Sequence, residues 1–230
     1  MHLPGENEII VVCGYKVLFF WSIWMESNLK KGYLESYEIA CGELSKKDPL
    51  QISLDTDAHY NGDDRCLKVR FLNIMHSVSF PGGEVAREDG AEVPDAVKAL
   101  ILHYLLHAKK TQPAEKLISF REVRGGGMNY YSVFCKRAIF PLQKAFEGET
   151  EKLAAAASGL GGMSEKYGDA SVTVPVFPLV PVTYVVWRKD DENPSSASIL
   201  FDSSISAYLP CEDIVLAASL GVYELIRRKN

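Results

Sequence analysis

The stretch from Ile118 to Phe146 reads ISFREVRGGGMNYYSVFCKRAIFPLQKAF. A β-favouring piece, Leu117 to Phe120, leads into three consecutive glycines. The pattern after them predicts a helix from Tyr130 to Phe146, which Asn129 caps and Pro141 kinks or breaks. Three glycines permit positive φ angles and close approach of a ligand or of another backbone. Two interpretations therefore stand, a ligand-facing turn and a tight strand-to-helix turn.

Composition limits the classes of partner. The chain of 230 residues is 47% hydrophobic and 24% charged, which is typical of a globular protein, and its formal net charge is -5. This charge argues against broad binding to nucleic acid or to an anionic membrane, because both need a basic surface. The five cysteines are scattered, without a Cys-x-x-Cys pair for zinc or an iron-sulfur cluster, so we expect free thiols and a cytoplasmic location.

The beginning of the chain differs from the rest. The run from Ile9 to Trp24 is apolar, but it is shorter than the roughly 20 residues of a membrane-spanning helix and contains Lys16. We therefore expect neither export nor stable membrane insertion. Met25 opens a conventional polar start, which indicates that residues 1–24 are upstream or non-core sequence and that residues 25–230 form a single domain. A short interfacial anchor is the alternative.

The first half of the remaining chain predicts helices around a β-meander. A helix from Ser27 or Asn28 to about Lys46 ends at Asp48-Pro49. A second helix starts at Pro94-Asp95 and runs to about Lys109. Between the two helices the pattern predicts antiparallel strands joined by turns such as Asn61-Gly62. These strand-like runs are Ile52–Tyr60, Cys66–Leu72 and Ile74–Phe80.

The second half predicts a short helix over 149–158, then a linker, a hairpin and a final helix. Prolines 175, 178 and 181 favour an extended or edge path before the hairpin. The hairpin pairs Val182–Arg188 with Ala197–Phe201. The helix Glu212–Arg228 is apolar nearly all round, which indicates a central packing element. The whole order predicts an α+β fold, with an antiparallel β-meander and hairpin covered by helices and the C-terminal helix central to the core.

His103 and His107 lie one turn apart on the second predicted helix. This spacing can chelate a metal, but no Glu follows the first histidine as in the His-Glu-x-x-His pattern, and no carboxylate is arranged nearby in sequence. Both histidines flank the apolar face of the helix. We therefore interpret them as histidines at the rim of the core and expect no bound metal.

Several segments occur in a characteristic order: Val78–Val85, Leu102–Leu106, Ile118–Glu122, Gly126–Tyr131, Lys136-Arg137, Ile199–Ser204 and Tyr208–Asp213. Together they resemble the family catalogued as domain of unknown function 3786, over about Asn28 to Ile226. The resemblance implies a soluble protein of anaerobic bacteria and archaea, joined in some members to a four-cysteine iron-sulfur module of corrinoid metabolism. This chain lacks those cysteines, so cluster chemistry would come from an iron-sulfur or corrinoid partner protein. The resemblance supplies no catalytic residues and no cofactor.

The first functional hypothesis is a non-catalytic binding or accessory protein that takes a small anionic ligand or cofactor at the turn Gly125–Tyr131. Glycine, aromatic and basic residues come together in the segments that carry the resemblance. The candidate ligand-binding residues are Arg121, Gly126, Gly127, Asn129, Tyr130, Tyr131, Arg137, Asp202 and Tyr208.

Two other hypotheses remain open. An enzyme would use Asp202, Glu212 or Asp213 as an acid or base beside Tyr130. These acids also have structural explanations, because Asp202 suits a turn cap and the other two complement a helix dipole. The third hypothesis is an assembly subunit that binds no ligand.

Overall fold

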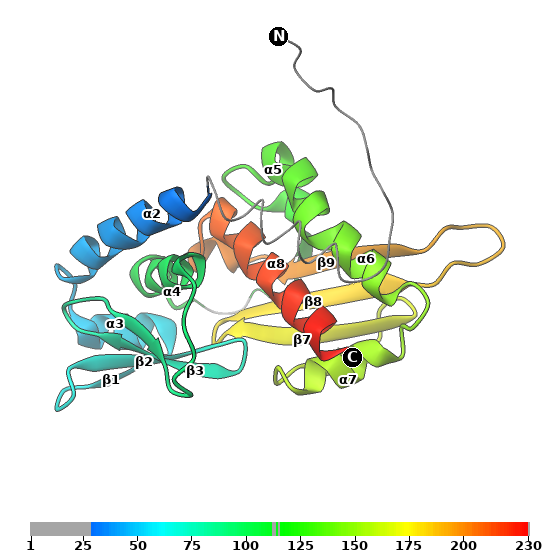
Figure 1. The fold of residues 1–230 in the computed structure, drawn as a ribbon. Coiled ribbons are helices and arrows are strands. Elements are labelled where there is room, and N and C mark those ends of the chain that lie inside the picture. The colour runs from blue at the N-terminus through cyan, green and yellow to red at the C-terminus, as the bar shows by residue number, and fades with distance from the viewer. Residues whose placement is uncertain (1–28, 112–113, 115, 230) are drawn as a thin grey trace, which may run out of the picture.

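The structure is a computed structural model that describes residues 29–111, 114 and 116–229. It confirms an α+β fold, and within the described residues every strand pair is antiparallel. The strands form two sheets, with the orders β1-β2-β3-β4 and β5-β9-β8-β7-β6 (Figure 1). The segment 1–24, which we expected to be separate from the core, lies outside the described residues.

The first two helices correct part of the predicted meander. Helix α2 (Leu29–Leu44) is followed by α3 (Pro49–Thr56), so the prediction of a strand over Ile52–Tyr60 is wrong for most of that run. Asp48 caps α3, since its side chain accepts a hydrogen bond from the Leu50 N–H at 3.0 Å. Pro49 stands in the first turn, where its missing N–H costs no helical hydrogen bond. Asp48-Pro49 therefore begins a helix as well as ending one.

The four-stranded sheet confirms the rest of the meander. It contains β1 (His59–Asn61), β2 (Cys66–Phe71), β3 (Ile74–Ser79) and β4 (Val85–Arg87), the last of which was not predicted. A two-residue turn, Leu72-Asn73, joins β2 to β3 with φ angles of 46° and 62°. Positive φ is unusual for leucine, but Leu72 is buried and its N–H donates to the Val176 carbonyl of the other sheet at 2.9 Å. The contact between the sheets thus supports this turn.

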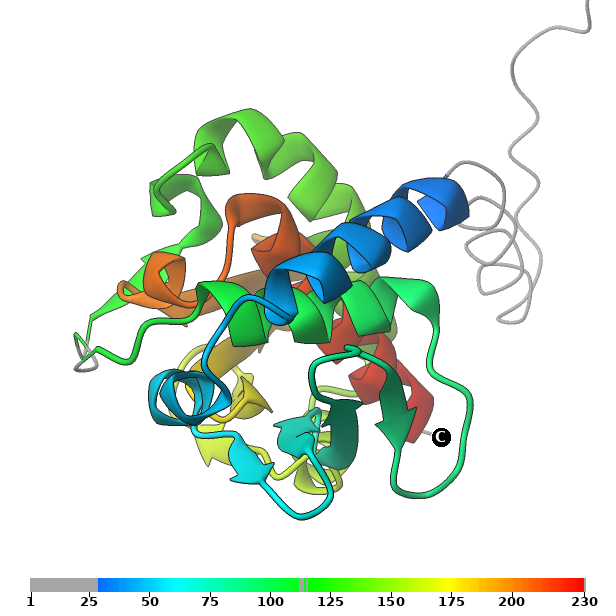
Figure 2. The same ribbon diagram turned by 90° about the vertical axis from the view of Figure 1, so that its left-hand side faces the viewer.

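Helix α4 (Asp95–His107) lies at the centre of the N-terminal half. Helix α2 lies along it on the side away from the small sheet (Figure 2). The Tyr104 ring stacks on Phe177 with centroids 4.2 Å apart, and Phe177 also lies 4.9 Å from the Phe71 ring. One apolar core therefore connects α4 with both sheets.

The glycine stretch folds as predicted in outline, with β5 (Leu117–Ser119), the 3-10 turn η1 (Phe120–Glu122) and helix α5 (Gly127–Phe134). Asn129 is not the cap that we expected, because the helix already begins at Gly127 and Gly126 takes the capping position. A π-helical turn, η2 (Cys135–Ile139), connects α5 to α6 (Phe140–Phe146). The Phe140 N–H donates to the Cys135 carbonyl just before Pro141, which has no N–H to donate. The helix therefore continues past Pro141, and the predicted kink or break is replaced by a wider, π-helical turn just before it.

The second sheet corrects the predicted linker. Helix α7 (Lys152–Ser158) leads to β6 (Met163–Glu165) and then to β7 (Ala170–Phe177), a strand that the proline spacing led us to miss. Strand β7 pairs with β8 (Val180–Trp187), and Pro175 lies opposite Pro181. Both prolines are tolerated because each lies beyond the end of its outer neighbour. Strand β6 pairs with β7 only as far as Thr173, before Pro175, and β9 pairs with β8 only from Val182 onward, after Pro181. No ladder hydrogen bond is lost on the outer side of either proline.

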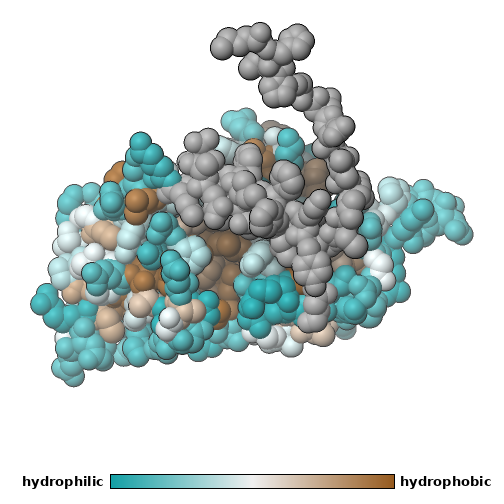
Figure 3. Space-filling model, viewed as in Figure 1, coloured by the Kyte–Doolittle hydropathy of each residue, from teal (hydrophilic) through white to brown (hydrophobic). Residues whose placement is uncertain are grey.

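The hairpin of β8 and β9 (Ser196–Asp202) was predicted correctly. Its loop, residues 188–195, projects from the molecule and is hydrophilic (Figures 1 and 3). The short turn η3 (Ile205–Ala207) then leads into α8 (Cys211–Arg228).

Helix α8 contacts α4, α5, α6, α7, η2 and β7, so it lies among both halves of the chain. Most of its residues from Cys211 to Val222 are buried. Within residues 29–111, 114 and 116–229, no helix combines the length and apolar character that crossing a membrane requires.

Candidate functional site

The predicted site residues lie in two groups. Asp202 and Tyr208 line a pocket, whereas the others lie along η1, α5 and η2. The segment from Tyr208 to Glu212 runs between the groups. Tyr208 lies at the pocket, and the Cys211 Sγ lies 3.9 Å from the position that a Gly126 Cβ would take.

The glycine turn allows two backbone segments to meet. Gly125 and Gly126 have φ angles of 86° and 132°, which L side chains rarely adopt. The Gly127 N–H donates to the Val123 carbonyl at 3.2 Å, and a Cβ on Gly127 would lie 2.0 Å from the Phe120 carbonyl oxygen. Gly127 is therefore needed for close packing of α5 on η1. This geometry supports the interpretation as a tight strand-to-helix turn.

The side chain of Arg121 is engaged within the chain. Its guanidinium carbon lies 4.0 Å from the Tyr131 ring centroid, a cation–π distance. Burial, followed by a hydrogen bond with the Cys135 side chain, raises the pKa of Tyr131. Arg137 is half-buried on η2, six residues beyond Tyr131.

Tyr130 lies beside the start of α8. Its hydroxyl hydrogen-bonds the Glu212 carboxylate, and this contact raises the pKa of Tyr130. A phenol with a raised pKa is a weaker acid, so the contact disfavours Tyr130 as a proton donor near neutral pH. Asn129 is exposed in the first turn of α5.

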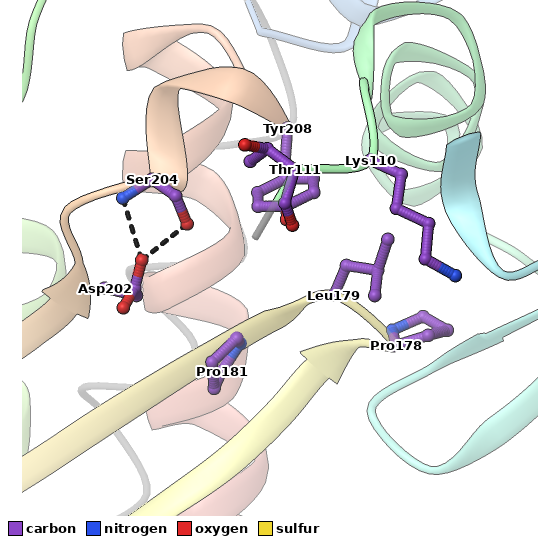
Figure 4. A pocket seen from close by; sticks show the side chains of 8 residues that line it. All are labelled: Lys110, Thr111, Pro178, Leu179, Pro181, Asp202, Ser204 and Tyr208. Carbon is purple, nitrogen blue, oxygen red and sulfur yellow. Dashed lines mark hydrogen bonds between the residues drawn. The ribbon is translucent and has the colours of Figure 1, made fainter. Parts of the chain in front are cut away.

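A pocket of ≈ 500 Å³ opens between the end of α4, the β7–β8 turn and η3 (Figure 4). Small-molecule sites commonly measure about 300–1,000 Å³ and are mostly apolar with a few polar groups. The residues that line it are Lys110, Thr111, Pro178, Leu179, Pro181, Asp202, Ser204 and Tyr208.

Asp202 ends β9 and stands at one end of this pocket (Figure 4). Its Oδ1 accepts hydrogen bonds from the Ser204 N–H at 2.9 Å, the Ser204 Oγ at 2.5 Å and the Ala114 N–H at 3.1 Å. The predicted turn cap is therefore confirmed. The same contacts fix the carboxylate in place at the pocket.

Lys110 lies at the other end of the pocket (Figure 4). Its Nζ lies 2.5 Å from Asp57 Oδ1, so the positive charge is paired at the pocket edge. The Tyr208 hydroxyl donates to the Thr111 carbonyl at 3.1 Å, which holds the buried Tyr208 ring against the segment after α4.

The sequence did not identify Lys110, Thr111 or the β7–β8 turn as site residues. They lie far from Asp202 in the chain, and no motif joins them. The prolines at 178 and 181 were the available signal, but their spacing also fits an extended linker.

A second polar cluster lies where α2, α4 and α8 meet. His103 Nδ1 lies 2.7 Å from Asp213 Oδ2, and His103 Nε2 lies 3.0 Å from Ser36 Oγ. Sequence reasoning placed His103 at the rim of the core and Asp213 at a helix start, but it did not join them. In the part of the chain that the structure describes, no group of three or more His, Cys, Asp or Glu side chains could hold a metal ion.

The fold and the pocket define the class: an α+β protein with two antiparallel sheets and a pocket of small-molecule size. The chain belongs to the family described as Domain of unknown function (DUF3786), whose model matches residues 48–224, more than half of the chain. This span is narrower than the resemblance over Asn28 to Ile226 and confirms the family. No curated protein and no solved structure matches the chain.

Proposed function

We propose that the protein binds a small molecule, without reacting with it, in the pocket between α4, the β7–β8 turn and η3. The observation that supports the proposal is the pocket itself, ≈ 500 Å³ with an apolar floor and a fixed carboxylate. Two of its polar residues, Asp202 and Tyr208, were candidates from the sequence. A pocket that combines apolar surface with a few positioned polar groups is the usual form of a small-ligand site.

The lining residues favour a particular ligand chemistry. Pro178, Leu179 and Pro181 offer apolar surface to the body of a ligand. Asp202 offers a carboxylate that accepts hydrogen bonds at one end of the pocket. We therefore propose a mostly apolar ligand with a neutral or cationic hydrogen-bond donor.

This ligand differs from the anionic one that we expected from the sequence. That expectation depended on Arg121 and Arg137, neither of which lines the pocket. An anionic group beside Asp202 would face a like charge.

Thermal shift measurements with three probes test the proposal. Benzylamine, benzyl alcohol and benzoate share a ring but differ in charge. We expect the amine and the alcohol to raise the Tm of the protein and benzoate to raise it least, because a ligand that binds only the folded state stabilises that state. Asp202→Asn keeps an oxygen acceptor for its backbone partners and should remove the preference for the amine.

A matched pair of variants locates the binding. Leu179→Trp should fill the pocket and abolish the shifts, whereas Leu54→Trp, on the exposed face of α3, should leave them unchanged. Equal shifts in wild type and Leu179→Trp would exclude this pocket. Absence of any shift, with these probes and with a wider set of small amines and alcohols, would favour the alternative of an assembly subunit without a ligand.

An accessory role in anaerobic metabolism remains part of the proposal. It comes from the family resemblance, which implies an iron-sulfur or corrinoid partner protein. Anaerobic purification from the host followed by mass spectrometry tests it. Co-purification of such a partner would support the role, and repeated purification without one would contradict it.

A further inference from the structure

Three helices bring Ser36, His103 and Asp213 into one chain of hydrogen bonds. Ser36 lies on α2, His103 on α4 and Asp213 in the first turn of α8. The Ser36 Oγ lies 3.0 Å from His103 Nε2, and the opposite ring nitrogen, Nδ1, lies 2.7 Å from Asp213 Oδ2. The histidine therefore stands between a hydroxyl and a carboxylate, with one ring nitrogen facing each.

The hydrogen-bond partners of His103 decide which of its ring nitrogens carries the hydrogen. An ionised carboxylate only accepts hydrogen bonds, so His103 Nδ1 carries the hydrogen that bonds Asp213. A neutral imidazole has a single N–H, which leaves a lone pair on Nε2. The Ser36 hydroxyl then donates to that lone pair. This is the tautomer in which the histidine can remove the serine proton.

Burial strengthens the contact between the acid and the histidine. The side chains of Asp213 and His103 are 12% and 22% exposed, so water screens their interaction little. Ser36 is half-buried, whereas Asp213 is buried. The serine is thus the more exposed end of the hydrogen-bond chain.

His107 completes the surroundings of His103. It lies one turn further along α4, with the two ring centroids 5.9 Å apart. Burial, and then the charge of His103, lowers the pKa of His107. His107 is therefore uncharged near neutral pH, so it adds no second positive charge when His103 takes up a proton.

We propose that Ser36 and His103 are the catalytic residues of an acyl-transfer site that accepts small esters or thioesters, with Asp213 as the positioning residue. The Ser36 Oγ forms a bond to the acyl carbon as its proton moves to His103 Nε2. The bond from the acyl carbon to the alcohol or thiol breaks, and the Nε2 proton goes to that leaving group. Water then attacks the acyl-serine with His103 as its base, which releases the carboxylic acid and restores the Ser36 hydroxyl.

This site is separate from the ligand pocket. It uses none of the residues that line the pocket, so either proposal can fail alone. The competing explanation is a polar network that only joins three helices. A network of that kind gives Ser36 no unusual reactivity.

A fluorophosphonate probe distinguishes the two explanations. The full chain is incubated with the probe and its mass is measured intact and after peptide mapping. We expect one adduct at Ser36, formed when the Oγ attacks phosphorus and fluoride leaves. The hydrolysis of p-nitrophenyl acetate by wild type should exceed that by Ser36→Ala.

Variants assign the roles. His103→Gln should lower the labelling rate of Ser36 by about 100-fold or more, because general-base assistance typically contributes that much. Asp213→Asn should also lower the rate, and Asp213→Glu should restore part of it, as expected of a carboxylate that orients the ring. His59→Gln, at an exposed histidine on β1, and Ser45→Ala, whose hydroxyl bonds the Gly42 carbonyl, are matched controls that should label at the wild-type rate.

Two results would overturn the proposal. One is wild-type protein that remains unlabelled at Ser36 after prolonged treatment, which requires no variant and no assumption about its folding. The other is labelling of Ser36 at the wild-type rate in a folded His103→Gln protein, checked by circular dichroism.

Discussion

Gly127 lies so close to the backbone of η1 that the position has no room for a side chain. A Cβ there would lie 2.0 Å from the Phe120 carbonyl oxygen and 3.3 Å from that of Arg121. The obstacle is the backbone of η1, which cannot rotate away as a flexible side chain can. Gly125, in contrast, has open space around it and needs glycine only for its φ of 86°. Two neighbouring glycines are thus required for different physical reasons.

We expect Gly127→Ala to lower the free energy of unfolding by about 1–3 kcal/mol or more, the usual cost of forcing atoms into a packed site. Gly148→Ala is the control, because a Cβ at that turn meets nothing within 4 Å. Urea unfolding of both variants measures the difference. Equal midpoints for the two variants would contradict the close contact between α5 and η1.

The end of α8 is tied to the segment before α7 by charge. Lys229 Nζ lies 2.6 Å from Glu149 Oε2 and also donates to the Ala145 carbonyl at 2.5 Å. Lys152 pairs with the other oxygen of Glu149. The hydrogen bonds from Lys152 and then Lys229 lower the pKa of Glu149 from its ordinary 4.5 to about 2. One partly exposed carboxylate therefore joins two helical elements.

The lowered pKa of Glu149 predicts an effect of pH on stability. A carboxyl group with a lower pKa in the folded state stabilises the protein above pH 4.5, and this contribution is lost as the pH falls through about 2. We expect Glu149→Gln to be less stable than wild type at neutral pH, with a difference that shrinks as the pH falls below about 4.5. Urea unfolding between about pH 7 and pH 3 measures it.

Glu35→Gln removes the same charge from the exposed face of α2 and serves as the control. A difference between wild type and Glu149→Gln that stays constant over this pH range would show that the ion pairs contribute nothing. High salt should weaken the effect of Glu149→Gln, since exposed charges are screened.

The two halves of the molecule are held together by α8 as it crosses the larger sheet. At the crossing, a Cβ on Gly221 would lie 1.9 Å from the Tyr184 hydroxyl oxygen. That hydroxyl donates to the Ala218 carbonyl at 3.3 Å, and Tyr184 is completely buried in the core. Burial raises the pKa of Tyr184, so the phenol stays uncharged. The helix can approach the sheet this closely only because glycine faces the tyrosine.

We expect Gly221→Ala to lower the free energy of unfolding by about 1–3 kcal/mol or more, because neither the helix nor the buried tyrosine can move without disturbing the core. Gly42→Ala in α2 is a matched helical control, where a Cβ meets nothing within 4 Å. The control should be stabilised by up to about 1 kcal/mol, as alanine is the better helix former. Thermal and urea unfolding compare them, and a Gly221→Ala protein as stable as wild type would contradict the packing of α8 on β8.

Local patterns were sufficient for elements that carry their own signals. The strand runs of β2 and β3 followed from their β-favouring residues, the hairpin of β8 and β9 from alternation and its polar turn, and α8 from its apolar run with acidic and basic ends. The sequence also placed Asp202 in a turn cap. In these cases the interactions that decide the structure join residues close together in the chain.

Tertiary contacts decided the rest. Strand β7 forms because β8 and the core accept Pro175 where the pairing with β6 has ended, which no local pattern reports. The pocket joins Lys110 to Asp202, and the polar cluster joins Ser36 to Asp213, across segments that approach only when the helices pack. The sequence by itself therefore determined the class of fold and the elements that carry local signals. The pocket and the Ser36–His103–Asp213 cluster depend on long-range packing, because their geometry exists only between elements that are distant in the chain.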